Sequence, residues 1–338
     1  MTIQDPTNAN KFDSSRLQTV GVFTSGGDAP GMNAAIRASV RIALHHGLEV
    51  KGAIGGYSGL VTGEFVSLSQ SSMGNIIQRG GTILKTGRCP EFHGAEARAK
   101  AVANARAAGI DAFVCIGGDG SFAGAHILWK EHRFPIIGVP ATIDNDIYGT
   151  DLTIGFDTAV NVALDAIDRI RDTAASHDRL FIVEVMGRDS GFIAVDVGMA
   201  GGAEEIFYPE NPVTVDKAID HIRRGMARGK KSSILVAAEG RKPGRAYDLA
   251  EAIRKKSGFD AKVCVLGHIQ RGGAPSASDR ILASRLGAGA INLLRAGHCD
   301  EMIGLRGQEL AVVPLGEALG KKKQVPADLV QLAQVLSS

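Results

Sequence analysis

The chain has 338 residues, enough for about two domains at the usual size of roughly 150 residues each. Hydrophobic residues make up 44% and charged residues 22%, an ordinary globular composition that excludes a disordered chain. There are 38 Lys and Arg against 36 Asp and Glu, so the net charge is +2 and no basic excess indicates a nucleic-acid binder. No apolar run approaches the roughly 18 residues that span a bilayer, and residues 1–15 lack the apolar segment of a secretory signal.

The cysteines do not have the CxxC spacing of a metal or redox site; they are Cys89, Cys115, Cys264 and Cys299. Cys115 and Cys264 lie in apolar runs and are predicted to be core residues. This pattern argues against a disulfide framework and a zinc site and predicts a cytoplasmic protein. The charge balance and the lack of a long apolar run predict neither a nucleic acid nor a membrane as partner.

Residues 1–16 are polar and without periodicity, which predicts a flexible extension. After them, short apolar runs alternate with longer Ala-rich amphipathic stretches up to about residue 313. The alternation predicts an α/β fold with parallel sheets and helices on both faces, and the tail from Lys321 predicts a basic turn and a short helix. The predicted strands are 19–24, 49–54, 112–116, 135–139, 180–185, 233–238 and 262–266, and the predicted helices are 30–46, 95–108, 158–175, 215–227 and 276–294.

A glycine-rich run, SGGDAPGMN at residues 25–33, directly follows the first predicted strand. A strand that leads through glycines into a helix presents backbone N–H groups to an anion, although a tight turn alone would also use glycines here. The run has neither GK[ST] nor GxGxxG, so it is not typical of a P-loop or a Rossmann fingerprint.

Two acidic junctions follow later strands. In GGDGS, residues 117–121, the glycines would admit a polyphosphate and Asp119 could hold Mg²⁺ together with phosphate oxygens and waters. In TIDND, residues 142–146, two carboxylates one residue apart would repel each other unless a cation or a proton transfer used them. A phosphoryl transferase needs an Asp that accepts the hydroxyl proton, a role that suits Asp144.

Basic residues on glycine-flanked loops indicate anionic groups bound at more than one point, because the guanidinium fork matches phosphate oxygens. They are Arg88, Arg179, Arg188 and Arg271, with His268 beside the last. Each alone would more often be a surface residue.

With these motifs in hand, the chain resembles the 6-phosphofructokinase family from about Gly21 to Leu315. The resemblance is carried by TSGGDAPGMNAAIR, RGGT, GGDGS, TIDND, IGFDTA, VEVMGR, AGG and LGHIQRGG in the family's order. It implies transfer of the γ-phosphoryl of MgATP to the 1-hydroxyl of fructose 6-phosphate. It also implies two similar three-layer αβα subdomains with mainly parallel sheets: residues 17–154 with 267–318 would bind ATP, and residues 155–266 with 319–338 would bind fructose 6-phosphate.

The resemblance also implies residue roles. Asp144 would be the general base, Arg88 would stabilise the transferring phosphoryl group, and Thr142 and Arg188 would support the same charge. ATP would be bound by Gly27, Arg88, Cys89, Gly118, Asp119, Gly120 and Ser121, with Asp119 as the Mg²⁺ residue. Fructose 6-phosphate would be bound by Thr142, Ile143, Asp144, Met186, Gly187, Arg188, Glu239, His268, Ile269, Gln270 and Arg271, with Arg179 and Lys262 reaching in from a neighbouring subunit of a homotetramer.

Two small residues predict the phosphoryl donor. Pyrophosphate-dependent relatives typically have Asp where this chain has Gly120 and Lys where it has Ala141. An Asp at 120 would repel the ATP α-phosphate, so both residues favour ATP, although Ala141 departs from the Gly more common in ATP enzymes. Lys262 departs as well, from the Arg of many bacterial members, which keeps the charge but loses the bidentate geometry.

An effector site for ADP and phosphoenolpyruvate is implied by Arg37, Arg41, Arg171, Gly202, Glu204, Arg228 and Lys230. Gln70, Asn75 and Ser232 depart from the residues typical of that site, which weakens the expectation of this regulation.

Three other functions remain open. A pyrophosphate-dependent phosphofructokinase is the nearest alternative. A non-catalytic regulator would not need Asp119 and Asp144, both of which are present. A nucleoside or other sugar kinase is disfavoured by Glu239, His268 and Arg271, which together suit a phosphorylated ketose.

Overall fold

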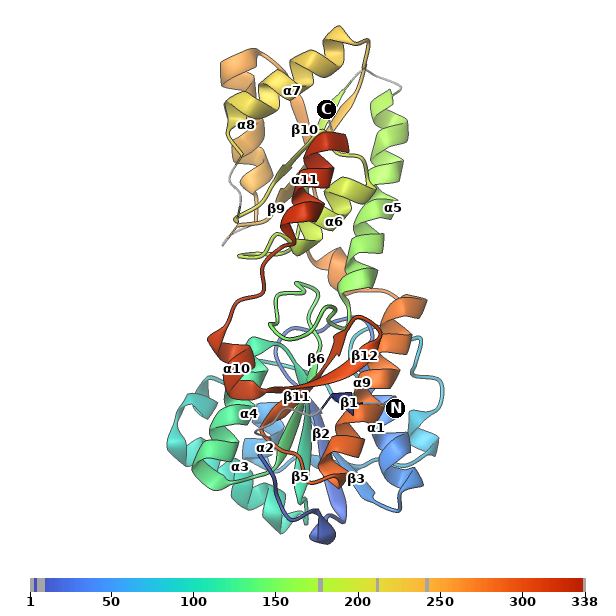
Figure 1. Cartoon of the computed structure of the whole chain (residues 1–338), viewed down its shortest axis with the longest axis vertical. Coiled ribbons are helices and arrows are strands. Elements are labelled where there is room, and N and C mark those ends of the chain that lie inside the picture. The colour runs from blue at the N-terminus through green and yellow to red at the C-terminus, as the bar shows by residue number, and fades with distance from the viewer. Residues whose placement is uncertain (1–2, 5–9, 176–178, 211–212, 241–242, 337–338) are drawn as a thin grey trace. The chain divides into compact units, whose positions relative to one another are not determined.

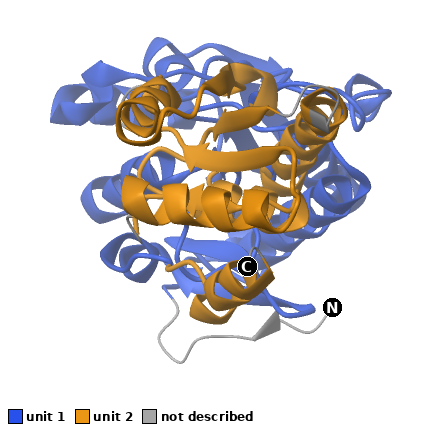
Figure 2. Ribbon diagram, turned by 90° about the horizontal axis from the view of Figure 1, so that it is seen from above, with its two compact units in different colours: residues 1–142, 147–155, 271–323 blue, residues 143–146, 156–270, 324–338 orange. Residues whose placement is uncertain are grey.

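A computed structural model describes the chain except for residues 1–2, 5–9, 176–178, 211–212, 241–242 and 337–338. The chain forms two compact units (Figure 2). The first consists of residues 1–142, 147–155 and 271–323, and the second of residues 143–146, 156–270 and 324–338. The predicted domains differ in assigning residues 143–146 and 267–270 to the first unit, residues 155 and 319–323 to the second, and residues 1–16 to neither. The ligand predicted for each domain stays a prediction.

An eight-stranded sheet runs through the first unit in the order β1-β12-β11-β6-β5-β2-β3-β4. The pairs from β11 through β6, β5 and β2 to β3 are parallel, whereas β12 and β4 run antiparallel to β11 and β3. The strands are β1 (Ile3–Gln4), β2 (Thr19–Thr24), β3 (Glu49–Ala53), β4 (Phe65–Ser67), β5 (Ala112–Gly117), β6 (Ile136–Pro140), β11 (Glu301–Arg306) and β12 (Glu309–Pro314).

Helices cover both faces of this sheet (Figure 1). Helices α1 (Met32–His45) and α9 (Ala277–Arg295) pack together on one face, and the other carries α2 (Tyr57–Thr62), α3 (Ala95–Ala107), α4 (Asp119–His132) and α10 (Leu315–Gly320). Short 3-10 helices are η1 (Ser14–Arg16), η2 (Ser71–Met73), η3 (Pro90–His93) and η4 (Gly267–Arg271), the last at the boundary between the units.

The second unit has a four-stranded, wholly parallel sheet in the order β10-β7-β9-β8. Its strands are β7 (Leu180–Val185), β8 (Glu205–Phe207), β9 (Ser233–Ala238) and β10 (Ala261–Val265). One face carries α7 (Val215–Ala227) and α8 (Arg245–Ser257), and the other carries α5 (Phe156–Ala175), α6 (Phe192–Ala200) and α11 (Ala327–Leu336).

The predicted fold class is confirmed, because both units are α/β with mainly parallel sheets. Strands β2, β7 and β9 and helix α7 have the predicted bounds, and the short C-terminal helix is α11. The antiparallel pair of β11 and β12, joined by a two-residue turn at Gly307 and Gln308, was not predicted.

The prediction of a flexible extension at residues 1–16 needs correction for the residues that the structure describes. Strand β1 pairs with β12, the Phe12 N–H donates to the Gly297 carbonyl at 2.8 Å, and the Cys299 N–H donates to the Asn10 carbonyl at 3.2 Å. This pairing uses main-chain groups, so the polar composition of the segment gave no sign of it.

Among the described residues, no helix combines the length and the apolar character that a membrane crossing requires. The predicted cytoplasmic location stays a prediction.

Candidate active site

Three parallel strands of the first unit end side by side. Strand β5 lies between β2 and β6, and main-chain hydrogen bonds continue this order into the loops beyond them. The Ser25 N–H donates to the Ile116 carbonyl at 3.0 Å, and the Ala141 N–H donates to the Gly117 carbonyl at 2.9 Å. The glycine-rich and acidic junctions therefore begin at one edge of the sheet, where open α/β sheets bind ligands.

The middle junction turns from β5 into α4 within one residue, Gly118. Asp119 and Gly120 are exposed in the first helical turn, and a Cβ built on Gly120 would meet no atom within 4 Å. Ser121 is buried, with its Oγ only 2.5 Å from where a Cβ on Gly117 would lie. The open helix N-terminus, with its partial positive charge, is suited to bind an anion.

The loop after β2 lies against Arg271. The Arg271 Nη1 donates to the Asp28 carbonyl at 3.1 Å, and a Cβ on Gly27 would come within 2.9 Å of the same nitrogen. Arg271 was predicted to bind fructose 6-phosphate; the structure has it in the first unit, beside the predicted ATP loop, while Gln270 belongs to the second unit.

The loop that carries Arg88 is held to the same edge by two threonines that the sequence analysis did not single out. The Thr86 hydroxyl donates to the Gly26 carbonyl at 2.9 Å, and the Thr24 hydroxyl donates to the Lys85 carbonyl at 2.8 Å. Arg88 is exposed, whereas Cys89 is half-buried against the core of the unit. The role of these threonines could not be predicted from their residue type, because it depends on which loops lie next to each other in the fold.

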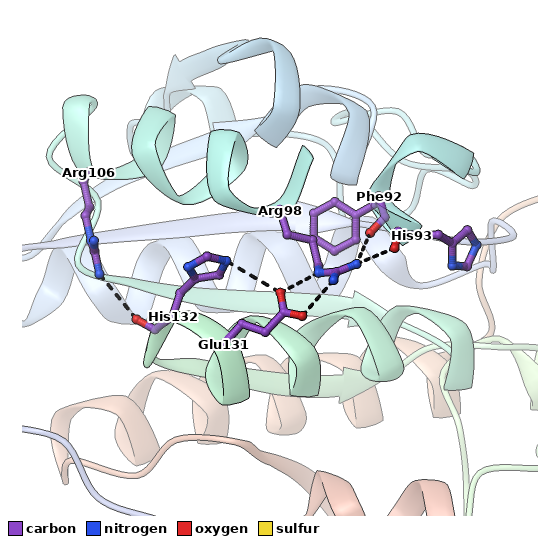
Figure 3. A network of polar contacts seen from close by, with 6 residues as sticks. All are labelled: Phe92, His93, Arg98, Arg106, Glu131 and His132. Carbon is purple, nitrogen blue, oxygen red and sulfur yellow. Dashed lines mark hydrogen bonds and ion pairs between the residues drawn. The ribbon is translucent and has the colours of Figure 1, made fainter. Parts of the chain in front are cut away.

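After Cys89 the chain is fixed by a buried arginine (Figure 3). The Arg98 guanidinium donates to both carboxylate oxygens of Glu131, at 2.6 and 2.7 Å, and to the carbonyls of Phe92 and His93, at 3.0 and 2.7 Å. These bonds join η3, α3 and the end of α4. The hydrogen bond from Arg98 holds the pKa of Glu131 below its usual range.

In the second unit, a buried amide fixes the end of β7. The Gln270 Oε1 accepts from the Met186 N–H at 2.8 Å and its Nε2 donates to the Ala159 carbonyl at 3.2 Å. Gly187 follows with φ of 139°, and a Cβ there would lie 2.5 Å from the Ser190 carbonyl oxygen, so only glycine fits. This turn leaves Arg188 exposed.

The same turn joins the TIDND loop, since the Ser190 hydroxyl donates to the Asp144 carbonyl at 3.0 Å. Glu239 follows β9, with its N–H donated to the Val185 carbonyl at 2.7 Å. The structure thus brings Asp144, the turn from Met186 to Arg188 and Glu239 close together within one unit. Thr142 belongs to the first unit, where its carbonyl accepts from the Thr153 hydroxyl at 2.6 Å.

Two predicted substrate residues are too buried for their side chains to contact a ligand. Ile143 and Gln270 are both 0% exposed, and the Gln270 amide is used by main-chain partners. The prediction that these two side chains contact the substrate is therefore wrong, and only their main-chain groups could do so. His268 and Ile269, in contrast, are exposed.

Arg179 and Lys262 line one cavity of about 370 Å³ in the second unit. Lys230 and Lys231 lie in the same wall, and the Lys262 Nζ pairs with Asp260 at 2.7 Å. The cavity concentrates positive charge, which suits an anionic partner. Lys231 was missed, although its position next to Lys230 was a visible signal.

The predicted effector residues fall into two sets. In the second unit Arg171 donates to the carbonyls of Gly201 and Gly202, and Lys230 forms an ion pair with the buried Glu204. Arg228 is exposed at the end of α7. Arg37 and Arg41 lie on α1 in the first unit. Regulation by ADP or phosphoenolpyruvate stays a prediction.

Known proteins resemble this chain over most of its length. The sequence model of the family described as "Phosphofructokinase" matches residues 19–294, most of the chain. The chain belongs to the phosphofructokinase family. It is 58% identical over 321 residues to ATP-dependent 6-phosphofructokinase 1 of Thermus thermophilus, covering 95% of this chain and 100% of that protein. It is 52% identical over 321 residues to ATP-dependent 6-phosphofructokinase of Bacillus cereus, with the same coverage.

Solved structures of the family share the fold. A phosphofructokinase from Saccharomyces cerevisiae superimposes with a TM-score of 0.84 at 35% identity, covering 90% of this chain and 45% of that one. A pyrophosphate-dependent phosphofructokinase from Marinobacter aquaeolei superimposes with a TM-score of 0.81, but at 24% identity this likeness concerns the fold alone.

The Arg98–Glu131 pair generates a pH-dependent prediction. Because the pKa of Glu131 is lowered in the folded chain, the pair stabilises the fold above the ordinary pKa of 4.5, and this stability is lost as the pH falls through the lowered value. Glu131→Gln should therefore lower the free energy of unfolding by about 1 kcal/mol near pH 7. The effect is small because the Glu131 side chain is partly exposed and solvent screens the ion pair. Urea unfolding should show that the difference in free energy of unfolding between the wild type and Glu131→Gln becomes smaller below about pH 4.

Glu96→Gln, which removes the same charge from an exposed position of α3, is the matched control and should change little. An equal loss of stability at all pH values would contradict the charge-based account of Glu131.

Proposed function

We propose that this phosphofructokinase transfers the γ-phosphoryl of ATP to the 1-hydroxyl of fructose 6-phosphate. The observation that carries the proposal is the exposed α4 N-terminus, with Asp119 and an open space over Gly120, at the common edge of β2, β5 and β6. Such a site can hold a polyphosphate by main-chain N–H groups. The reaction belongs to glycolysis, and the names of relatives at 52–58% identity support ATP as donor.

ATP is proposed to lie over Gly27, Gly118, Gly120 and Ser121, with Arg88 and Cys89 beside its phosphates. Thr86 already joins the loop that carries Arg88 to Gly26, so the backbone of this loop is fixed beside the glycine-rich run. A fixed loop lowers the cost of bringing the Arg88 charge to a transferring phosphoryl group.

Mg²⁺ is proposed to be brought to the site with ATP. No group of three or more His, Cys, Asp or Glu that could hold a metal occurs in the part of the chain that the structure describes. A single exposed carboxylate, Asp119, still fits Mg²⁺, which is commonly held by one or two carboxylates together with phosphate oxygens and waters. When bound there, the ion would offset phosphate charge.

In the second unit, Asp144 is proposed to accept the proton of the sugar hydroxyl. The Ser190–Asp144 bond supports this role because it fixes the backbone of the base beside the turn of Met186, Gly187 and Arg188. Glu239, His268 and Ile269 of the same unit are proposed to contribute to the fructose 6-phosphate site. Gln270 would act by holding Met186 in place.

Asp144→Asn should reduce kcat by two or more orders of magnitude, the usual scale for a lost general base, while fructose 6-phosphate binding is retained. The amide keeps the size of the side chain, and the carbonyl that Ser190 contacts is unchanged. A coupled assay of fructose 1,6-bisphosphate formation gives kcat, and calorimetry gives the binding constant. Turnover at the wild-type rate would remove Asp144 from this role.

The donor can be tested at Gly120. The space above it is open and would receive an Asp side chain, whose charge would then meet the ATP phosphates. The wild type should be active with ATP and inactive with pyrophosphate as the only donor, and Gly120→Asp should lose more than tenfold in kcat/KM for ATP.

Gly120→Ala, which fills the space without charge, is the control and should lose less. Wild-type activity with pyrophosphate would instead favour the pyrophosphate-dependent alternative. Ala141 is buried with its N–H bonded to Gly117, so it has no room for the Lys of those relatives without rearrangement.

The enzyme is further proposed to be a homotetramer in which Arg179 and Lys262 bind the fructose 6-phosphate of a neighbouring subunit. Both side chains are exposed, and both line the same positively charged cavity, which suits a phosphate brought by another chain.

Subunit mixing tests this arrangement. Arg179→Ala and Asp144→Asn should each be nearly inactive alone. After dissociation and reassembly together, about one quarter of the sites should combine an intact Asp144 with an intact Arg179 from the neighbour and regain activity. Mixed assemblies that regain none would show that Arg179 acts within its own subunit; mixing Asp144→Asn with itself is the control.

A further inference from the structure

A cluster of charged side chains in the first unit takes no part in the proposed reaction. Its centre is Asp300, 4% exposed, just before β11. The His126 Nδ1 of α4 lies 2.7 Å from one carboxylate oxygen of Asp300, and the Asn10 Nδ2 donates to the other at 3.2 Å. One buried carboxylate thus joins the N-terminal segment to α4.

The N-terminal segment is itself well fixed. Residues 10–12 pair with residues 297–299 through main-chain bonds, and Lys11 and His298 form an isolated bridge. The Lys11 Nζ lies 2.5 Å from the His298 Nε2, and the His298 Nδ1 lies 2.8 Å from the Glu301 carboxylate. Asn10 therefore meets Asp300 from a defined position.

Asp300 is also held by its own backbone. Its N–H donates to the Ile136 carbonyl at 2.9 Å, its carbonyl accepts from the Leu315 N–H at 2.9 Å, and its φ of 58° lies in the left-handed region. Burial raises the pKa of Asp300, and the hydrogen bond from His126 opposes that rise. Because the Asp300 carboxylate is fixed by its own backbone, it can hold His126 of α4 in one position.

Helix α4 links this cluster to the phosphate site. His126 lies about two turns after Asp119. Phe122, Ala125 and Leu128 are fully buried, so this side of the helix is closely packed against the core. A close-packed helix responds as one rigid body, so a shift at His126 should also displace its first turn.

We propose that Asn10 and His126 are positioning residues that hold α4 through Asp300, so that the N-terminal segment sets the affinity of the Gly118–Ser121 turn for ATP. The inference rests on the proposed ATP site at that turn. Asn10 lies outside residues 19–294, which the family model matches, and the Thermus relative aligns with only 95% of this chain.

The chain carries its own reporter for this helix. Its single tryptophan, Trp129, lies on α4 three residues after His126, is 8% exposed, and has the Arg133 guanidinium 5.3 Å from its ring centroid. A change in the seating of α4 should change the emission of Trp129.

The test uses Asn10→Ala and His126→Gln in the full chain. Each should raise KM for ATP about three- to tenfold, the scale of one hydrogen bond, and shift the Trp129 emission, while KM for fructose 6-phosphate and kcat at saturating ATP stay within about twofold. The double variant should match His126→Gln alone, because Asn10 acts on α4 only through Asp300 and His126.

Thr150→Val is the matched control, because it removes a hydrogen bond to β11, from the Leu305 N–H at 3.0 Å, without touching α4. It should lower the melting temperature and leave KM for ATP unchanged. If Asn10→Ala and His126→Gln behave in the same way as this control, the positioning role is wrong. That failure differs from a failure of the proposed ATP site, in which Asp119→Asn would retain wild-type affinity and turnover with MgATP.

Discussion

The proposed ATP site depends on the order of three strands at the sheet edge. Because β5 lies between β2 and β6, the carbonyls at its end, Ile116 and Gly117, accept the N–H groups of Ser25 and Ala141. Main-chain bonds therefore fix where each loop begins, and the side chains beyond are left for a ligand. Glycines and small residues at this edge leave the backbone exposed, as the proposed binding of phosphate by main-chain N–H groups requires.

The second unit reaches an ordered site by another route. The turn after β7 includes Gly187 and Arg188, both with positive φ, and side chains as well as main-chain bonds hold it in place. The buried Gln270 amide links Met186 to Ala159, and Ser190 links its turn to Asp144. A buried amide with both of its polar atoms satisfied is costly to displace, which suits a residue that sets the position of a substrate loop.

Much of this arrangement could be predicted from sequence, because apolar runs followed by glycines and acids mark both the strands and their functional ends. Asp119 and Asp144 were predicted as site residues in this way, and their roles stay predictions. The burial of Gln270 was not, because nothing local distinguishes a glutamine that bonds main chain from one that meets substrate. Arg98 and Glu131 are 33 residues apart in the chain, so their pairing has no local signal either. Contacts between residues far apart in the chain could not be predicted, because they depend on the tertiary structure and leave no periodic pattern in the sequence.

Helix α4 combines these constraints. Its N-terminal turn leaves Asp119 and Gly120 exposed at the proposed phosphate site, and Gly118 and Gly120 contribute no side chain that could pack there. The helix must therefore be anchored further along. Gly124 admits the Tyr57 ring, since a Cβ would lie 2.7 Å from it; His126 meets Asp300; and Glu131 meets Arg98. These three contacts lie beyond the first turn of the helix, so they fix its position while Asp119 and Gly120 stay exposed.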